Sequence, residues 1–386
     1  MPDGRISYKT MVGKNDAGKP RFLQVYQRKG ETPSQLKVRF DSEFERYMSA
    51  KPLLGENSSM YDIVKNGSNT LVKDFFKQYL IDFKKPTVKP STYAYYKNIM
   101  LSNIVPYIGE YKLRELRPMV LQSYIKELCE KGLSYRTVKG ALQLLKSGLA
   151  EAVYNELLDK NPADNIKIPK KTTKKSINVF SKEQQKIFMK AIKGHMYETF
   201  YTMAITTGMR CGEMLGLTWE NIDLDKKVIN VCQNLTIVYD KEDGSSVHIG
   251  TPKSSAGVRN IPIPDVLKTV LEIHKREHML MFGEVEGFVF KTFKNKPYRS
   301  KSHFSKALRK ICVENDLPII NLHALRHTFA TRGLEAGVMP RTMQRLLGHE
   351  DYMLFTTTYS HVLDDVYEQE SEKLVEAINQ INDPVG

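Results

Sequence analysis

NLHALRHTFATRGLEAGVMPRTMQRLLGHED, residues 321–351, is the stretch of this sequence in which functional side chains are most concentrated. Its apolar residues recur at helical spacing, which predicts helices rather than strands. His323, Arg326 and His327 fall within five residues, and Gly348-His349 stands near the end. The stretch has no cysteine and few carboxylates. Imidazole and guanidinium groups in this pattern indicate a site for either a metal ion or an anion.

The metal hypothesis is tested by the pentapeptide HALRH. His323 and His327 are four residues apart, which is the spacing of the zinc-binding H-E-x-x-H motif. However, Ala324 stands where the general-base glutamate of that motif belongs, and Arg326 would put a fixed positive charge beside the cation. The sequence therefore favours neither a metal site nor a cofactor.

A phosphate is the anion that suits these side chains. Arginine offers a planar fork that bonds two oxygens at once, and histidine adds a directional donor or a proton shuttle. A phosphodiester attacked at phosphorus accumulates charge on its oxygens, so fixed donors stabilise the transition state. Because the protein would supply the positive charge, the nucleophile should be a protein side chain or water.

The charge of the chain points to a polyanionic partner. The net charge is +14 over 386 residues, and residues 350–386 hold nine acidic residues and one lysine. That segment carries −8, so residues 1–349 carry +22. A merely basic surface is the simpler alternative, but nucleic acid is the favoured partner for a body of this charge.

The length predicts two or three domains, each with its own core. We expect no membrane span, because no run of about 18 apolar residues occurs. The first residues, MPDGRISYKTMVGK, lack the apolar region of a secretion signal. The four cysteines show no paired short spacing, which fits a reducing cytoplasm rather than a disulfide framework.

The chain falls into three blocks. Residues 1–40 contain nine basic and three acidic residues; RFLQVYQRK alternates as a strand does, and SEFERYMSAK is a candidate helix. Residues 70–165 read as helices, and Val138, Leu142, Leu145, Leu149 and Ala152 predict one buried stripe. After a lysine-rich linker, the third block mixes helices with strands, of which KVINVCQNLTIVYD and SSVHIGTPKSSAGVRNIPIP look like neighbours.

One group of side chains at the start of that striped helix could contact DNA. The segment SYRTVK places polar and basic side chains at a helix N-terminus, a geometry that suits a phosphate. The alternative, an ordinary N-cap with solvated basic residues, has equal weight. The residues are Ser134, Arg136, Thr137 and Lys139.

A second arginine lies in ITTGMRCGEMLGLTWENID. Gly208 predicts a break just before Arg210, and Glu213 can share a helical face with Arg210 and fix its rotamer. Taken alone, this segment is better interpreted as a surface ion pair. Lys253, in TPKSSAGVRNIPIP, lies where a strand enters a tight turn, and a single lysine there is usually just solvated.

These segments together are similar to the tyrosine recombinase (phage integrase) family, most of all to integrases of conjugative transposons and related phages. The family pattern is an arginine in TG-x-R-x-x-E, a lysine on a β-hairpin, H-x-L-R-H-T-x-A-T, LGH, and a tyrosine in T-x-x-Y-x-H. This chain has TGMRCGE, TPKSS, HALRHTFAT, LLGH and TTTYSHV in that order. The likeness covers roughly residues 70–365.

The resemblance implies a role for each matching residue on the side of the phosphate. Arg210 and Arg326 would clamp the scissile phosphate. His323 and His349 would donate hydrogen bonds to it, or move the proton of the nucleophile.

The resemblance also implies the nucleophile and its helpers. Tyr359 would attack phosphorus and form a 3′-phosphotyrosine, and Lys253 would protonate the leaving 5′-oxygen. Glu213 would support the first arginine, and His327 is expected to have a structural, supporting role. Tyr352 lies too close to the LGH segment for the spacing that the family has, so we expect it not to be the nucleophile.

The implied fold is multidomain: a small basic α+β N-terminal domain, an all-α core-binding domain, and a mixed, mainly α catalytic domain with a small antiparallel sheet. This is the tyrosine recombinase, or DNA breaking-rejoining, fold. The expected segments are residues 1–60 for arm-type DNA binding, 70–165 for core binding, 166–177 as a basic linker, 178–363 for catalysis, and 364–386 as an acidic tail that contacts another protomer.

The implied function is site-specific recombination that integrates and excises a mobile element. The expected partners are double-stranded DNA at core attachment sites, with arm-type sites as a further candidate, and a homo-tetramer on DNA. DNA-bending accessory proteins and an excisionase are further candidates. Two other functions compete with this one: a type IB topoisomerase-like enzyme that relaxes DNA, and a DNA-binding regulator of the same fold that does not cleave.

Overall fold

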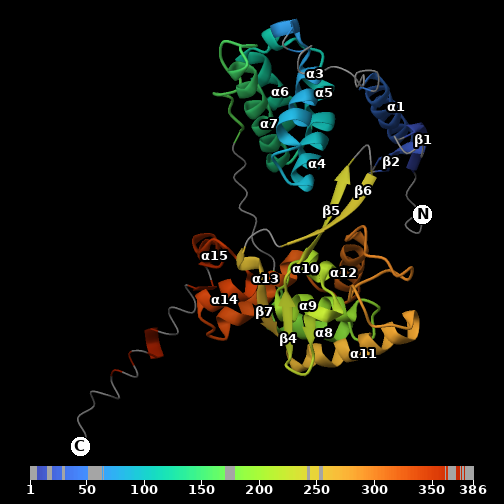
Figure 1. Cartoon of the computed structure of the whole chain (residues 1–386), viewed down its shortest axis with the longest axis vertical. Coiled ribbons are helices and arrows are strands. Elements are labelled where there is room, and N and C mark those ends of the chain that lie inside the picture. Colours follow the sequence, from blue (N-terminus) through green and yellow to red (C-terminus); the bar gives the residue numbers. More distant parts are fainter. Residues whose placement is uncertain are drawn as a thin grey trace, which may run out of the picture. The chain divides into compact units, whose positions relative to one another are not determined.

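In the computed structural model the chain divides into two units (Figure 1). Each unit has its own hydrophobic core. Unit 1 comprises residues 1–173 and 238–246, and unit 2 comprises residues 174–237 and 247–386. The structure describes residues 7–14, 20–27, 31–50, 63, 65–169, 179–240, 244–251, 255–360, 362–363, 371–373, 375 and 378.

Unit 1 begins with two antiparallel strands, β1 (Ser7–Lys14) and β2 (Pro20–Tyr26), followed by the helix α1 (Pro33–Ala50). The strand predicted from RFLQVYQRK is therefore confirmed. The helix starts nine residues earlier than SEFERYMSAK suggested, because Thr32 and Gln35 form a capping box. The amide of Gln35 donates to the Thr32 hydroxyl, and the amide of Thr32 donates to the Gln35 side chain.

A helical bundle makes up the rest of unit 1. Its longest helix, α7, buries the predicted stripe completely: the side chains of Val138, Leu142, Leu145, Leu149 and Ala152 all lie in the core. The helices are α3 (Val72–Tyr79) with the π-helical turn η3 (Leu80–Lys84), α4 (Pro90–Ile99), η4 (Met100–Ile104), α5 (Val105–Ile108), α6 (Pro118–Glu130) and α7 (Tyr135–Tyr154), with short 3-10 turns η2 (Gly67–Asn69) and η5 (Leu113–Glu115).

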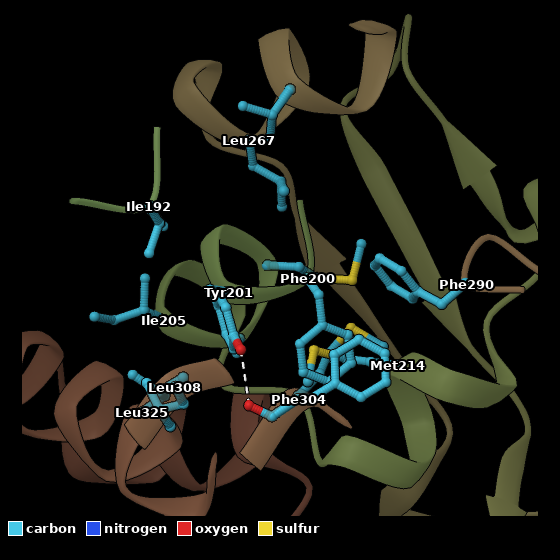
Figure 2. Packing of buried hydrophobic residues seen from close by; sticks show 14 of the residues in the cluster. Ile192, Phe200, Tyr201, Ile205, Met214, Leu267, Phe290, Phe304, Leu308 and Leu325 are labelled. Carbon is cyan, nitrogen blue, oxygen red and sulfur yellow. Dashed lines mark hydrogen bonds between the residues drawn. The ribbon is translucent and has the colours of Figure 1, made fainter. Parts of the chain in front are cut away.

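Unit 2 is built around the buried helix α9. Phe200 of this helix stacks on Phe304 with ring centroids 4.0 Å apart, and the Tyr201 hydroxyl donates to the Phe304 carbonyl over 2.7 Å (Figure 2). The helices are α8 (Lys182–Ala191), α9 (Glu198–Thr207), α10 (Cys211–Gly216), α11 (Asp265–Phe282), α12 (Ser302–Glu314), α13 (Leu322–Glu335), α14 (Pro340–Leu347) and α15 (Tyr352–Thr358), with short turns η6 (Trp219–Asn221) and η7 (Ser255–Gly257).

The two predicted strand runs are neighbours, as expected, but they do not form a single sheet. Each of the two strand-rich runs splits in two, so that β4 pairs with β7 in one sheet while β5 and β6 form another. The strands are β3 (Ile222–Asp223), β4 (Val228–Val231), β5 (Asn234–Asp240), β6 (Gly244–Gly250) and β7 (Arg259–Pro262). The break after β4 has a physical reason: the Gln233 side chain donates to the Gly216 carbonyl, and the Leu235 backbone packs closely against that glycine.

A second, smaller cluster of unit 2 joins α13, α14 and α15. It consists of Ala330, Leu334, Met343, Leu347, Phe355, Tyr359 and Val362. This cluster holds Tyr359, the tyrosine of the segment TTTYSHV.

Several predicted segments fall partly or wholly outside the described residues. Lys253 is one of them, and so is most of the basic linker 166–177. In the acidic tail 364–386, only residues 371–373, 375 and 378 are described, and they are helical. Within the part of the chain that the structure describes, no helix is both long and apolar enough to span a membrane.

Candidate active site

The helix α13 carries three of the predicted residues within about one turn: His323, Arg326 and His327. Its N-terminus is capped by Asn321, whose side chain accepts from the Ala324 amide over 3.0 Å. His323 and His327 then lie edge to face, with ring centroids 4.6 Å apart. Arg326 extends from the same helix into the interior and is only 2% exposed. The i, i+4 spacing of the histidines therefore produces an edge-to-face imidazole pair beside a buried guanidinium.

Two helix C-termini hold Arg326 in place. Its guanidinium donates to the Gly208 carbonyl and to the Leu347 carbonyl, each over 2.7 Å. These carbonyls lie at the ends of α9 and α14, where backbone groups have no partner within the helix and carry partial negative charge. Burial, with the positive charge of Arg210, lowers the pKa of Arg326 to about 9, which still leaves it protonated at neutral pH.

Arg210 is anchored differently. It stands directly before α10, where its guanidinium donates to Glu213 and to the Gly348 carbonyl, each over 2.8 Å. Its side chain remains 39% exposed, unlike that of Arg326. Gly348 ends α14 with a left-handed φ of 65°, and a Cβ there would lie 2.9 Å from the Ala256 carbonyl oxygen. The turn thus requires glycine in order to present its carbonyl to Arg210.

Glu213 is not part of a surface ion pair, as its segment alone suggested, because its side chain is only 2% exposed. It accepts from Arg210 and also from Arg259, whose Nη2 is 2.8 Å from Oε2. Burial by itself raises the pKa of Glu213, but hydrogen bonds and charge from Arg259 and then Arg210 outweigh it and hold the pKa below its usual value. The carboxylate is therefore charged and shared between two arginines.

Arg259 is a residue that the sequence analysis missed. Its side chain is 7% exposed, and it also donates to the Leu346 carbonyl over 2.6 Å and to the Gly257 carbonyl over 2.9 Å. It links β7 to α10 and α14. The available signal was an arginine two residues before Ile261, and so on the same face of the strand as this buried residue, in VRNIPIP.

His349 follows the left-handed glycine at the end of α14. Its carbonyl accepts from the Gln344 side chain over 2.7 Å, and its ring lies 5.9 Å from that of Phe355. Its Nδ1 is buried and has no hydrogen-bond partner among the described residues. Burial, followed by the charges of Arg326 and Arg210, lowers the pKa of His349 to about 3, so the ring is neutral.

Tyr359 and Tyr352 differ sharply in environment. Tyr359 is 1% exposed, packs against Phe355, and has its hydroxyl 2.7 Å from Nδ1 of His327. Burial raises the pKa of Tyr359 to about 12, although the charge of Arg326 opposes that shift. Tyr352 is 37% exposed, and the guanidinium of Arg341 lies 5.5 Å from its ring centre. The first tyrosine, not the second, belongs to the cluster of arginines and histidines.

The structure thus brings most of the predicted residues together in unit 2. They are Arg210, Glu213, His323, Arg326, His327, His349 and Tyr359. Burial, and then the charges of Arg326, Arg210 and Lys301, lower the pKa of His323. Lys253 is outside the described residues, so its place is not assigned.

The candidate DNA-contacting residues belong to unit 1 instead. Ser134 caps α7 by accepting from the Thr137 amide over 3.1 Å, so the segment begins a helix as predicted. Arg136 and Lys139 are exposed beside it. Their contact with a phosphate stays a prediction.

The chemistry open to the cluster is transfer at a phosphodiester. Two fixed guanidinium groups can hold non-bridging oxygens, neutral imidazoles can donate hydrogen bonds, and a phenol can attack. Among the described residues, no group of three or more histidine, cysteine, aspartate or glutamate side chains is placed to hold a metal ion.

Two families of domains match the sequence. The Phage integrase family matches residues 170–365, which include the whole cluster, and the Phage integrase, N-terminal SAM-like domain matches residues 71–129. The chain belongs to the phage integrase family.

Curated relatives of this integrase support the same family. The chain is 30% identical over 343 residues to "Tyrosine recombinase XerC-like" of Caldanaerobacter subterraneus subsp. tengcongensis, covering 82% of this chain and 86% of that protein. It is 30% identical to the ICEBs1 integrase of Bacillus subtilis, covering 74% of this chain and 78% of that one. The transposase from transposon Tn916 of Enterococcus faecalis is 26% identical, covering 79% and 77%. The chain is a site-specific tyrosine recombinase of the conjugative-transposon or prophage type.

Solved structures confirm the fold. The Tn1549 transposon integrase in complex with transposon right end DNA has a TM-score of 0.66 at 23% identity, covering 79% of this chain and 100% of that one. A lambda integrase tetramer bound to a Holliday junction has a TM-score of 0.56 at 15% identity, with 93% of each chain covered. The expected tyrosine recombinase fold, mainly helical with small antiparallel sheets, is therefore confirmed.

Proposed function

We propose that this integrase cuts and rejoins DNA strands with Tyr359 as nucleophile and Arg210 and Arg326 as the phosphate clamp. The observation that carries the proposal is the position of the Tyr359 hydroxyl, buried in the same cluster as both guanidinium groups. The preformed anchoring of the arginines supports it, because donors that need no rearrangement stabilise developing charge most effectively.

The first transesterification breaks one bond and forms another. The Tyr359 Oη attacks phosphorus, the bond between phosphorus and the 5′-oxygen breaks, and a 3′-phosphotyrosine forms. The phenol passes its proton to one of the neutral histidines of the site, His323 or His349, and the leaving 5′-oxygen gains a proton, for which Lys253 is the proposed donor. Rejoining is the reverse: a 5′-hydroxyl attacks the phosphotyrosine and releases the tyrosine.

The two histidines supply hydrogen bonds rather than charge. Because burial lowers the pKa values of His323 and His349, both rings are neutral near pH 7 and each has one N–H to donate. We assign them to the non-bridging oxygens of the phosphate, beside the arginines. Glu213 fixes the orientation of Arg210 without touching the DNA.

We further propose that double-stranded DNA at core attachment sites is the substrate, held by the helical segment 70–165 and the catalytic segment 178–363. The charge of +22 on residues 1–349 supports this, as do the exposed Arg136 and Lys139 at the start of α7. Segment 1–60 is assigned to arm-type DNA, and segment 364–386 to contact between protomers of a tetramer. Accessory DNA-bending proteins and an excisionase are candidate further partners.

The test uses a nicked attachment-site duplex that loses a short strand after cleavage and so traps the covalent intermediate. The wild-type protein should form an adduct that survives denaturation, and it should do so in EDTA, since arginine and lysine side chains supply the positive charge. Loss of the adduct on chelation would overturn the proposed mechanism. A duplex without the attachment site is the control, because a relaxing topoisomerase would cleave that one too.

A further inference from the structure

His327 is the polar member of the cluster that the proposed chemistry leaves without a task. Its Nδ1 lies 2.7 Å from the Tyr359 hydroxyl, within hydrogen-bond distance. Among the described residues, His327 is the hydrogen-bond partner of that hydroxyl. The tyrosine is 1% exposed, so water cannot readily replace the partner. A buried hydroxyl that loses its partner is left desolvated without compensation, which destabilises the fold.

The direction of this hydrogen bond follows from the protonation states. Burial first, then the nearby His323 and Arg326, lower the pKa of His327 to about 4, so its ring is neutral. Burial keeps the Tyr359 phenol protonated. A phenol O–H therefore donates to an unprotonated Nδ1, and the ring hydrogen is on Nε2. This fixes the O–H bond toward His327 and turns the oxygen lone pairs away from it.

The surroundings of Tyr359 do not by themselves orient its hydroxyl, so the hydrogen bond to His327 is important. The tyrosine belongs to the small cluster between α13, α14 and α15, and its ring contacts Phe355 at a centroid distance of 5.0 Å. Apolar packing restricts where the ring lies but does not choose a direction for the hydroxyl, because such contacts are non-directional. Only a hydrogen bond does that. His327 comes from α13, the same helix that carries Arg326, so the bond ties the hydroxyl to the phosphate clamp.

We propose that His327 is a positioning residue, which accepts the Tyr359 hydroxyl hydrogen bond through Nδ1 and so aims the oxygen for attack. The inference rests on the proposed function, in which Tyr359 is the nucleophile. It goes beyond a supporting role in packing, because it assigns one ring nitrogen to one reacting atom. Misplacement of a reacting group by about 1 Å can slow a reaction by roughly 10²-fold.

The experiment compares three substitutions that differ in where an acceptor lies. In His327→Asn the amide oxygen lies near the position of Nδ1, in His327→Gln it lies near that of Nε2, and His327→Phe has none. Each variant is mixed with the nicked attachment-site duplex, and the rate of adduct formation and the affinity for intact duplex are measured. We expect His327→Phe and His327→Gln to cleave about 10²-fold more slowly, His327→Asn to stay within about 10-fold of wild type, and all three to bind DNA normally.

A thermal-unfolding cycle gives a readout that does not depend on activity. The melting temperatures of wild type, His327→Phe, Tyr359→Phe and the double variant should be non-additive, because either single change removes the same hydrogen bond. Additive changes would overturn the inference. So would equal rates for the Asn, Gln and Phe variants, or a His327→Phe protein that cleaves as fast as wild type or faster. If Tyr359→Phe itself still formed the adduct, the proposed function would fail instead.

Discussion

The two sides of the proposed active site, one for the phosphate and one for the nucleophile, are built in opposite ways. On the phosphate side, Arg210 and Arg326 are fixed by backbone carbonyls at the ends of α9 and α14 and by Glu213, which is 2% exposed. On the nucleophile side, Tyr359 belongs to a small apolar cluster and its hydroxyl bonds to one imidazole. The clamp thus depends on many backbone contacts, whereas the aim of the nucleophile depends on a single side chain.

This difference shows how the arginine clamp can be preformed while the alignment of Tyr359 stays open to change. Backbone carbonyls at helix ends move only if whole helices move, so the clamp is ready before DNA arrives. The tyrosine can be misaligned by changing one hydrogen bond, without disturbing the clamp. We therefore expect changes on the nucleophile side to stop or slow cleavage without weakening DNA binding, and changes on the phosphate side to have their larger effect on stability as well as on cleavage.

Tyr359→Phe is the change with the largest expected effect. It removes one oxygen and leaves the arginines and the small cluster in place. Covalent adduct formation should disappear completely rather than slow down, because no nucleophile is left. DNA binding should be unchanged, as measured by gel shift on an intact attachment-site duplex.

Tyr352→Phe is the matched control. This tyrosine is 37% exposed and lies outside the cluster, so cleavage should stay close to the wild-type rate. If Tyr359→Phe kept the adduct and Tyr352→Phe lost it, Tyr352 would be the nucleophile instead of Tyr359.

Arg326→Ala should lower both the cleavage rate and the stability of the fold. It removes a fixed donor for the transition state, which typically slows cleavage by about 10²–10³-fold. It also leaves the Gly208 and Leu347 carbonyls without their donor in a buried site, so the melting temperature should fall. Cleavage rate and thermal unfolding are measured on the same preparation. A slower enzyme with unchanged stability would show that the helix-end carbonyls do not depend on this arginine.

Glu213→Gln tests the anchor of the phosphate side. The change keeps the volume but removes the charge that Arg210 and Arg259 share. Because the Arg259 side chain is 7% exposed, it would be left buried without its ion pair, and breaking such a pair typically costs about 3–5 kcal/mol. We expect a lower melting temperature and cleavage slowed by about 10-fold, since the rotamer of Arg210 is no longer fixed.

The control for this variant is Glu272→Gln. That residue pairs with Lys268 across one turn of α11 and is 48% exposed, so its loss should change stability little. Equal effects of the two substitutions would contradict the buried network.

The smallest expected effect is a dependence of stability on pH. Burial lowers the pKa values of His327 and His349 to about 4 and 3, while both are near 6.5 in the unfolded chain. Between these limits the unfolded state binds more protons, so stability is complete above pH 6.5 and decreases as pH falls toward 4. The melting temperature should drop by several degrees from pH 7.5 to 5, and His349→Gln should flatten that slope. An unchanged slope in the variant would contradict the assignment.

The sequence could predict which residues of α13 lie together, because they sit at fixed helical spacings, whereas the pairing of Arg210 with Arg326 was predicted only from the family resemblance. One helix separates His323 from Arg326 by three residues and from His327 by four, so their closeness follows from the helix itself. The left-handed glycines were also foreseeable in part, since Gly208 interrupts a helical pattern just before Arg210. The buried stripe of α7 followed from its periodicity in the same way.

Other features depend on contacts between distant segments. Arg259 reaches Glu213 across 46 residues, and His327 reaches Tyr359 across 32, and no local pattern encodes either distance. For the same reason the sequence predicted that the two strand runs are neighbours, but not that each run is divided between two sheets, the first of them at its contact with α10. The burial of Glu213 could not be read from its i, i+3 spacing, which is equally typical of a surface pair.

The most direct test of the account is to identify the amino acid joined to DNA. The trapped adduct from the nicked duplex is digested with protease, and the peptide that carries the nucleotide is sequenced by mass spectrometry. The account predicts a 3′-phosphotyrosine at Tyr359, in the peptide that contains TTTYSH. A nucleotide on Tyr352, or on any other residue, would contradict it.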